Sequence, residues 1–178
     1  MLALKDFEKV GMDSSALIAI VHCPSNLEEF RNKFYSCKEA FYHASVSESE
    51  VIGVLINKYF FQPSEARDAW NQLTAELNLN LIFWKDQTLA NYRGQVVLAN
   101  QELIKAEDNP RLEIGEADKS IISSFLKEDI KKVYTLDRAF EKTCNLLGMK
   151  VYRLPEEYLK RVEEVRRLNK KFFIKKPR

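Results

Sequence analysis

Residues 9–21, KVGMDSSALIAIV, place a short apolar strand directly before an apolar helix, with Asp13 at the junction. The apolar residues on both sides of Asp13 predict two buried elements, because neither element offers a polar face to solvent. Further strands are predicted over 39–46, 79–84, 131–136 and 149–154, with helices between them. Strands joined through helices pair in parallel by right-handed crossovers. The sequence therefore predicts a three-layer α/β/α sandwich around a central parallel sheet of about five strands.

Serine, proline and glycine mark the expected helix ends. Ser25 is expected to cap the second helix, with Glu28 completing a capping box. The helix after the second strand is expected to begin at Glu48, and Pro63 is expected to open the next one. Gly148 is expected just beyond the end of a later helix, where a left-handed residue is common. Further helices are predicted over 86–107, 116–127 and 137–147, and from 155 onward.

The composition describes a globular chain with unevenly distributed charge. Its 178 residues are 46% hydrophobic and 30% charged, with a formal net charge of +2, which suits one folded domain. Nine basic residues against two acidic ones give residues 160–178 a formal charge of +7, which leaves −5 for residues 1–159. We therefore expect a domain over 1–158, followed by a basic C-terminal helix or tail over 159–178.

The cysteine, histidine and apolar patterns argue against several classes of protein. Cys23, Cys37 and Cys144 are odd in number and form no CxxC pair, which favours a reducing cytoplasm over a disulfide framework or zinc site. His22 and His43 are too few for a typical zinc centre and are expected to be packing residues. No stretch of about 18 apolar residues predicts a membrane span.

Four carboxylates follow strands or open the helices beside them. Asp13 and Asp137 come directly after the first and fourth strands. Glu50 is expected in the first turn of the helix after the second strand, and Asp118 in the first turn of the helix before the fourth. Each acid alone can be a helix cap or a favourable first-turn charge. Because ligands in such folds bind where parallel strands end, we expect the four acids to meet at that edge.

A cluster of this kind suits a hard divalent cation. Mg²⁺ and Mn²⁺ prefer oxygen ligands, and carboxylates that crowd together raise one another's pKa unless a cation balances them. The chemistry that this implies is metal-assisted hydrolysis of a phosphodiester bond. Ser14, Ser15 and Thr135 are expected to support the site by hydrogen bonding to a carboxylate or to a water molecule.

The motifs around these acids resemble those of the PIN-domain family, which includes the VapC-like ribonucleases. The four segments stand in the family's order between residues 9 and 153, and they read VGMDSSALIAI, SVSESEVIGVL, GEADKSII and VYTLDRAF. The resemblance implies an endoribonuclease that uses Mg²⁺ or Mn²⁺, is often a homodimer, and holds its metal on Asp13, Glu50, Asp118 and Asp137. Many compact relatives are toxins restrained by an antitoxin protein, and others process ribosomal RNA.

Several alternatives stay open at this level. Glu48 and Glu116 each lie two residues from an assigned acid and can replace or join it as a ligand. A non-catalytic RNA- or protein-binding module of the same fold is the second functional hypothesis. A receiver-type phosphoacceptor domain is the third, but that domain needs an acid pair at its first strand, where Asp13 stands alone. RNA contact is expected from the basic residues Arg138, Lys170, Lys171, Lys175 and Lys176.

Overall fold

The computed structural model describes residues 7–34 and 38–175 and contains a five-stranded, all-parallel sheet. The strands are β1 (Glu8–Met12), β2 (Glu39–Ala44), β3 (Asn80–Ile82), β4 (Lys132–Thr135) and β5 (Lys150–Arg153). Their order across the sheet is β3-β2-β1-β4-β5. The chain first builds outward from β1 to β3 and then returns to the other side of β1 for β4 and β5. The change of direction lies between β1 and β4, and the carboxyl ends of these two strands flank the expected ligand position.

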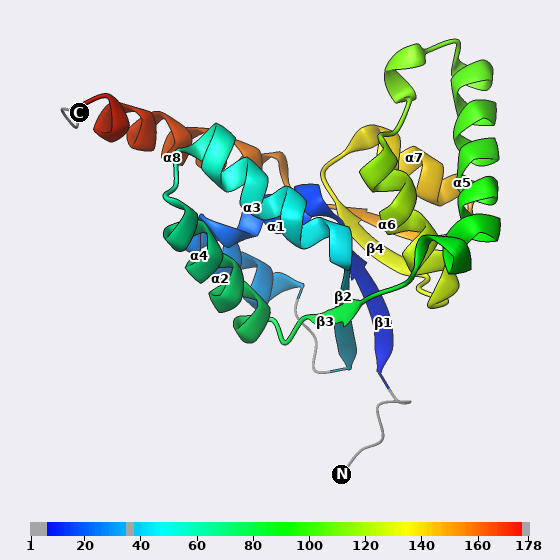
Figure 1. Cartoon of the computed structure of the whole chain (residues 1–178), viewed down its shortest axis with the longest axis horizontal. Helices are drawn as coiled ribbons and strands as arrows, with labels where there is room; N and C mark the ends of the chain where they lie inside the picture. The colour runs from blue at the N-terminus through cyan, green and yellow to red at the C-terminus, as the bar shows by residue number, and fades with distance from the viewer. Residues whose placement is uncertain (1–6, 35–37, 176–178) are drawn as a thin grey trace.

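Helices cover both faces of the sheet and confirm the predicted α/β sandwich (Figure 1). One face is covered by α1 (Ser14–Val21), α2 (Pro24–Lys33), α3 (Ser45–Tyr59), α4 (Pro63–Glu76) and α8 (Glu156–Lys175). The other face is covered by α5 (Asp86–Glu107), α6 (Glu116–Lys127) and α7 (Arg138–Leu146), with the short 3-10 turn η2 (Pro110–Leu112) before α6. In the described part of the chain, no helix is both long and apolar enough to cross a membrane.

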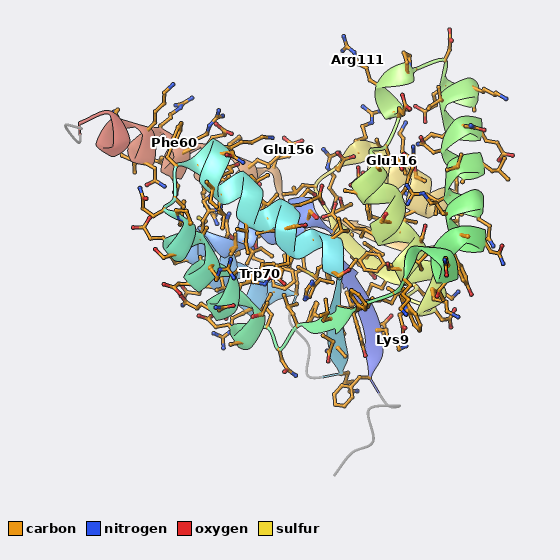
Figure 2. The ribbon with its side chains drawn as sticks, in the orientation of Figure 1. Lys9, Phe60, Trp70, Arg111, Glu116 and Glu156 are labelled. Atoms are coloured by element: carbon orange, nitrogen blue, oxygen red, sulfur yellow. The ribbon has the colours of Figure 1, made fainter. Side chains whose placement is uncertain are left out.

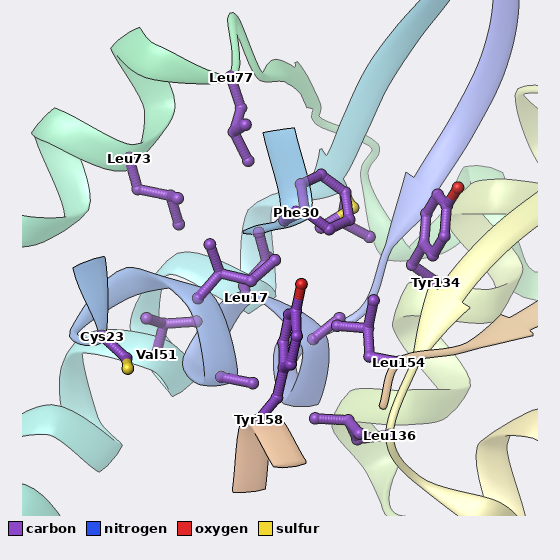
Figure 3. Packing of buried hydrophobic residues seen from close by; sticks show 14 of the residues in the cluster. Leu17, Cys23, Phe30, Val51, Leu73, Leu77, Tyr134, Leu136, Leu154 and Tyr158 are labelled. Carbon is purple, nitrogen blue, oxygen red and sulfur yellow. The ribbon is translucent and has the colours of Figure 1, made fainter. Parts of the chain in front are cut away.

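Two hydrophobic clusters, one on each face, hold the helices in place. In the first cluster the Tyr158 ring of α8 lies among Leu17, Leu136 and Leu154 (Figure 3). The second cluster is built around Phe125 and its neighbours on α6 and α7. A Cβ atom on Gly11 of β1 would come within 2.7 Å of the Phe125 ring, so the glycine allows α6 to pack directly on the central strand. This close packing fixes the position of α6 relative to the carboxyl end of β1.

Two of the predicted helix starts are wrong. β2 ends at Ala44, whose partner Ile82 is the last residue of β3, so the strand has no neighbour to pair with beyond that point. α3 therefore begins at Ser45 instead of Glu48, and Glu50 lies in the second helical turn. α2 begins at Pro24 with Cys23 as its N-cap, instead of being capped by Ser25, because proline is well suited to the first helical position.

Most of the other predicted helix ends are confirmed. Pro63 opens α4, and Gly148 takes a left-handed φ of 78° just after α7. His22 and His43 are both buried packing residues, as expected. Cys23 and Cys144 are buried free thiols, and Cys37 lies outside the described residues.

The C-terminal segment is one long helix, α8, whose first half belongs to the core. Tyr158 and Val162 are fully buried. Farther along, the Arg166 Nε donates to the Lys58 carbonyl and the Asn169 Nδ2 donates to the Tyr59 carbonyl at 3.0 Å. These bonds satisfy backbone acceptors at the end of α3. The expected boundary between the domain and the C-terminal segment, at residues 158 and 159, lies inside α8.

Candidate active site

Asp13 lies at the carboxyl end of β1 and is 2% exposed. Its Oδ1 accepts a hydrogen bond from the Ala16 amide at 2.8 Å, so it does cap α1. Its carboxylate also accepts from two hydroxyl groups: the Ser15 Oγ lies 2.9 Å from both carboxylate oxygens, and the Thr135 Oγ1 donates to Oδ2 at 2.6 Å. A cap needs only the first of these bonds, so the other two indicate a carboxylate held in one orientation.

The same two hydroxyl groups connect the loops after β1 and β4. The Thr135 Oγ1 accepts a hydrogen bond from the Asp137 amide at 2.9 Å, and the Ser15 Oγ accepts one from the Leu136 amide at 2.8 Å. Asp137 in turn caps α7, with its Oδ1 accepting from the Phe140 amide at 2.8 Å. Asp13 and Asp137 are therefore both helix caps, and the hydroxyls of Ser15 and Thr135 join them into one unit.

Glu50 reaches this unit from α3. The Ser14 Oγ donates a 2.6 Å hydrogen bond to the Glu50 Oε2, which ties the second turn of α3 to the start of α1. Glu48 points elsewhere, because two residues on a helix differ by about 200° in direction. Its side chain is exposed and lines an open depression of about 400 Å³ together with Arg67 on α4. The structure thus places Glu50, and not Glu48, beside the other acids.

Asp118 lies in the first turn of α6, as predicted, and its Oδ2 accepts from the Gly115 amide at 3.2 Å. Glu116, two residues earlier, is exposed on the side of the molecule away from Lys9 of β1 (Figure 2). It pairs with Arg93 of α5 and, at 2.7 Å, with Lys119. These two cations lower the pKa of Glu116, with the Lys119 hydrogen bond as the largest cause. Glu116 is therefore already balanced by positive charge, whereas no ion pair is formed by Asp118 within residues 7–34 and 38–175.

The four acids interact through their charges. Burial is the main cause that raises the pKa of Asp13 to about 7; the hydrogen bonds from Thr135, Ala16 and Ser15 oppose it, and the Asp118 charge adds to it. Burial also raises the pKa of Asp118 to about 6, with further contributions from the charges of Asp137 and Glu50. The charges of Asp137 and Glu50 thus disfavour the ionised form of Asp118, and the charge of Asp118 disfavours that of Asp13.

The donor chemistry of this cluster fits a hard cation, although the side chains do not form a closed cage. All four candidate ligands are carboxylates, the ligand type that Mg²⁺ and Mn²⁺ prefer. Within residues 7–34 and 38–175, no three His, Cys, Asp or Glu side chains are arranged to bind one ion directly. Mg²⁺ commonly keeps several water ligands and uses only one or two carboxylates, so the site needs no such cage to hold it.

The basic residues expected to contact RNA lie in two places. Arg138 is exposed immediately after Asp137, at the start of α7. Lys170 and Lys171 are exposed on α8, which ends at Lys175. Lys176 lies outside the described residues. The sequence did not predict the ion pair between Arg93 and Glu116, because the two residues are 23 positions apart and belong to different helices.

No family model matches this chain, and no curated protein matches it. Among solved structures, its fold is similar to that of a chain in the crystal structure of VapBC2 from Rickettsia felis bound to a DNA fragment from the promoter of that system. The TM-score is 0.53 and the sequence identity is 14%, and the match covers 83% of this chain and 99% of that chain. At this level of identity the likeness shows the fold, and the roles of individual residues rest on the geometry described above.

Proposed function

We propose that this chain is a divalent-metal-dependent endoribonuclease that hydrolyses RNA phosphodiester bonds. The proposed active site consists of four acids: Asp13, Glu50, Asp118 and Asp137. The observation that carries the proposal is the convergence of these acids, from β1, α3, α6 and the β4–α7 junction, at the carboxyl edge of the sheet. Folding gains nothing from crowding like charges in a partly buried place. A cluster that disfavours its own ionisation is typical of a functional site.

The side chains of this chain would prepare the site in distinct ways. Ser15 and Thr135 fix the Asp13 carboxylate, and Ser14 orients the Glu50 carboxylate. The four acids would hold Mg²⁺ or Mn²⁺, which when bound supplies the positive charge that makes a water molecule more acidic and stabilises the leaving oxygen. Since the pKa of Asp13 is raised to about 7, the metal-free site is mostly protonated at Asp13 below that pH, and a cation would displace this proton.

The narrower proposal is that the chain is the toxin of a toxin–antitoxin pair, acts as a homodimer, and is restrained by a cognate antitoxin. It is supported by the resemblance of the four acidic motifs to PIN-domain toxins and by the fold likeness to a chain of the VapBC2 structure. RNA is the proposed substrate, and the exposed basic residues Arg138, Lys170 and Lys171 are proposed to contact its phosphates.

One observation is equally compatible with a second candidate function, a non-catalytic RNA- or protein-binding module. No three described acids are arranged as direct ligands of one ion, as a degenerate site would also show. The two functions differ in a simple respect: a binding module retains RNA without cutting it, with or without metal.

A cleavage assay on mixed RNAs tests the proposal. The parent protein should cleave RNA in the presence of Mn²⁺, and cleavage should stop when EDTA is added. The Asp118→Asn variant should lose activity by orders of magnitude. Glu48→Gln is the matched control for Glu50→Gln: both remove one charge from α3, but only Glu50 bonds to Ser14. Cleavage that continues in EDTA would rule out the metal mechanism. RNA binding without cleavage under every metal condition would favour the binding module.

A further inference from the structure

Asn100 is a buried amide in the middle of α5, a helix whose neighbouring inward residues are apolar. Its exposure is 3%, and Val96, Ala99 and Leu103 surround it on the same side of the helix. Asparagine is a weak helix former, and a buried amide is costly unless its hydrogen bonds are made. We therefore expect this side chain to hydrogen-bond to polar groups that an apolar residue would leave unpaired.

The amide makes three hydrogen bonds to two other elements. Its Nδ2 donates to the Leu112 carbonyl at 2.8 Å and to the Thr143 Oγ1 at 3.0 Å, and its Oδ1 accepts from the Ile114 amide at 3.3 Å. The orientation of the amide follows from this chemistry, because the Leu112 carbonyl cannot donate and the Ile114 amide cannot accept. The Thr143 hydroxyl donates its own proton to the Ala139 carbonyl at 2.9 Å.

These partners lead to two of the four acids. Leu112 and Ile114 belong to the segment that ends at Gly115, whose amide binds the Asp118 carboxylate. Thr143 belongs to α7, the helix capped by Asp137. The Asn100 side chain is thus a bridge between the segment that presents Asp118 and the helix that presents Asp137. Because both acids carry like charge, packing and hydrogen bonds such as those of Asn100 have to hold the two segments together against this repulsion.

We propose that Asn100 is a positioning residue of the acid site, which sets the separation of Asp118 and Asp137 by joining the Leu112–Gly115 segment to α7. This inference rests on the proposed function, because a fixed separation matters only if the two acids act on the same ion. Groups that orient metal ligands from outside typically change metal affinity by about 10- to 100-fold when removed.

The test uses Asn100→Leu, which keeps the number and branching of the heavy atoms in the side chain and removes all three bonds. The matched control is Asn26→Leu. Asn26 of α2 is equally buried and makes three hydrogen bonds, to Ala19, Tyr158 and Arg161, on the opposite face of the sheet. Both variants lose the same kind of bonds and are expected to be destabilised to a similar degree, which separates positioning from general loss of stability.

Two measurements are made on the full-length chain without RNA. The first is Mn²⁺ affinity by calorimetry, expected to weaken about 10-fold or more in Asn100→Leu and to stay within about 2-fold of the parent in Asn26→Leu. The second is hydrogen exchange in EDTA at the Lys119 amide, which donates to the Gly115 carbonyl at 3.0 Å and reports on the first turn of α6. This amide should exchange about 10-fold faster or more in Asn100→Leu and not in Asn26→Leu, because exchange there requires only local opening of the first turn of α6.

Equal exchange at Lys119 in the two variants would overturn the role of Asn100. If the parent binds no Mn²⁺, the proposed function fails, but the exchange measurement still decides whether Asn100 holds the start of α6. Should Asn100→Leu fail to fold, Thr143→Val keeps the shape of the Thr143 side chain and removes the bond between Asn100 and α7, together with the Thr143 bond to the Ala139 carbonyl within α7. It should shift both measurements in the same direction, to a smaller extent.

Discussion

The Thr135 hydroxyl donates a 2.6 Å hydrogen bond to the Asp13 carboxylate and accepts another from the Asp137 amide. One oxygen atom thus connects the two acids that follow the first and fourth strands. The hydrogen bond to Asp13 stabilises its ionised form, and it is the largest of the causes that oppose the effect of burial on the pKa of Asp13. A fully buried threonine at this position therefore serves the neighbouring acid as well as the strand.

Thr135→Val keeps the shape of the side chain and removes the hydroxyl. We expect the pKa of Asp13 to rise further and the Mn²⁺ affinity to fall about 10-fold or more. The free energy of unfolding should decrease by about 1–2 kcal/mol. Calorimetry measures the change in Mn²⁺ affinity, and urea unfolding measures the change in stability. Ser124→Ala is the control, since its buried hydroxyl bonds only within α6, to the Ser120 carbonyl. Unchanged Mn²⁺ affinity in Thr135→Val would contradict a supporting role for the hydroxyl.

The pKa of Asp13 predicts how the stability of the metal-free protein depends on pH. Burial raises this pKa from 3.8 to about 7, so the folded chain binds more protons than the unfolded chain between these values. The stabilisation by the protonated group is complete below about pH 4 and is lost as the pH rises through 7. Between pH 5 and 8 in EDTA, the parent should lose up to a few kcal/mol relative to Asp13→Asn, at about 1.4 kcal/mol per pKa unit.

The comparison with Asp13→Asn isolates this one group. Asp118 also has a raised pKa, and the burial of His22 lowers its pKa to about 4, but both groups are present in the two proteins. Urea unfolding of each protein at several pH values gives the difference. A difference in unfolding free energy that does not change with pH would mean that Asp13 ionises with an ordinary pKa.

The sequence predicted the face of α3 correctly but not its first residue. SVSESE contains polar residues that suit either a strand end or a helical first turn, so local preference does not locate the boundary. The boundary depends on where β3 stops pairing with β2, at Ile82, which is a long-range contact. The direction of Glu50 depends instead on its phase relative to Val51 and Val54, and this phase does not change when the helix starts earlier.

The connections around the third acid could not be predicted from the sequence. Asp118 was placed correctly because a first-turn acid and the Ile121–Ile122 stripe define the phase of α6. The bond between Arg93 and Glu116 joins two helices, and so does the bond between Asn100 and Thr143. Such side-chain partners depend on the distance between packed helices, and no short pattern in one chain encodes that distance.

The exposed lysines of α8 predict how RNA binding responds to salt. Lys170→Ala with Lys171→Ala should weaken RNA binding in EDTA, because each phosphate contact to single-stranded RNA releases about 0.7 counterions. The slope of log affinity against log salt should flatten by about 1.4 if both lysines contact phosphate. Binding is measured by fluorescence anisotropy between 50 and 200 mM salt, roughly the range over which such effects are large. Lys105→Ala, an exposed lysine on α5, is the control. An unchanged slope would assign these lysines to another role.

The last prediction separates a metal site from four unrelated helix caps. Asp13→Asn keeps the shape of the side chain and, because asparagine is also a good N-cap, most of the cap to Ala16. It removes one like charge from the cluster, so the melting temperature in EDTA should rise or stay unchanged while cleavage is lost.

Added Mn²⁺ should stabilise the parent more than Asp13→Asn, because a ligand that binds only the folded state stabilises it by mass action. At 100 times its dissociation constant this amounts to about 2.7 kcal/mol, roughly 5–10 °C in melting temperature for a chain of this size. Asp129→Asn is the control. Asp129 is an exposed acid paired with Lys131 just before β4, away from the carboxyl edge of the sheet, and its removal should leave the Mn²⁺ response intact. Equal Mn²⁺ responses in the parent and in Asp13→Asn would show that Asp13 is only a helix cap, because a side chain that does not bind the metal contributes nothing to stabilisation by Mn²⁺.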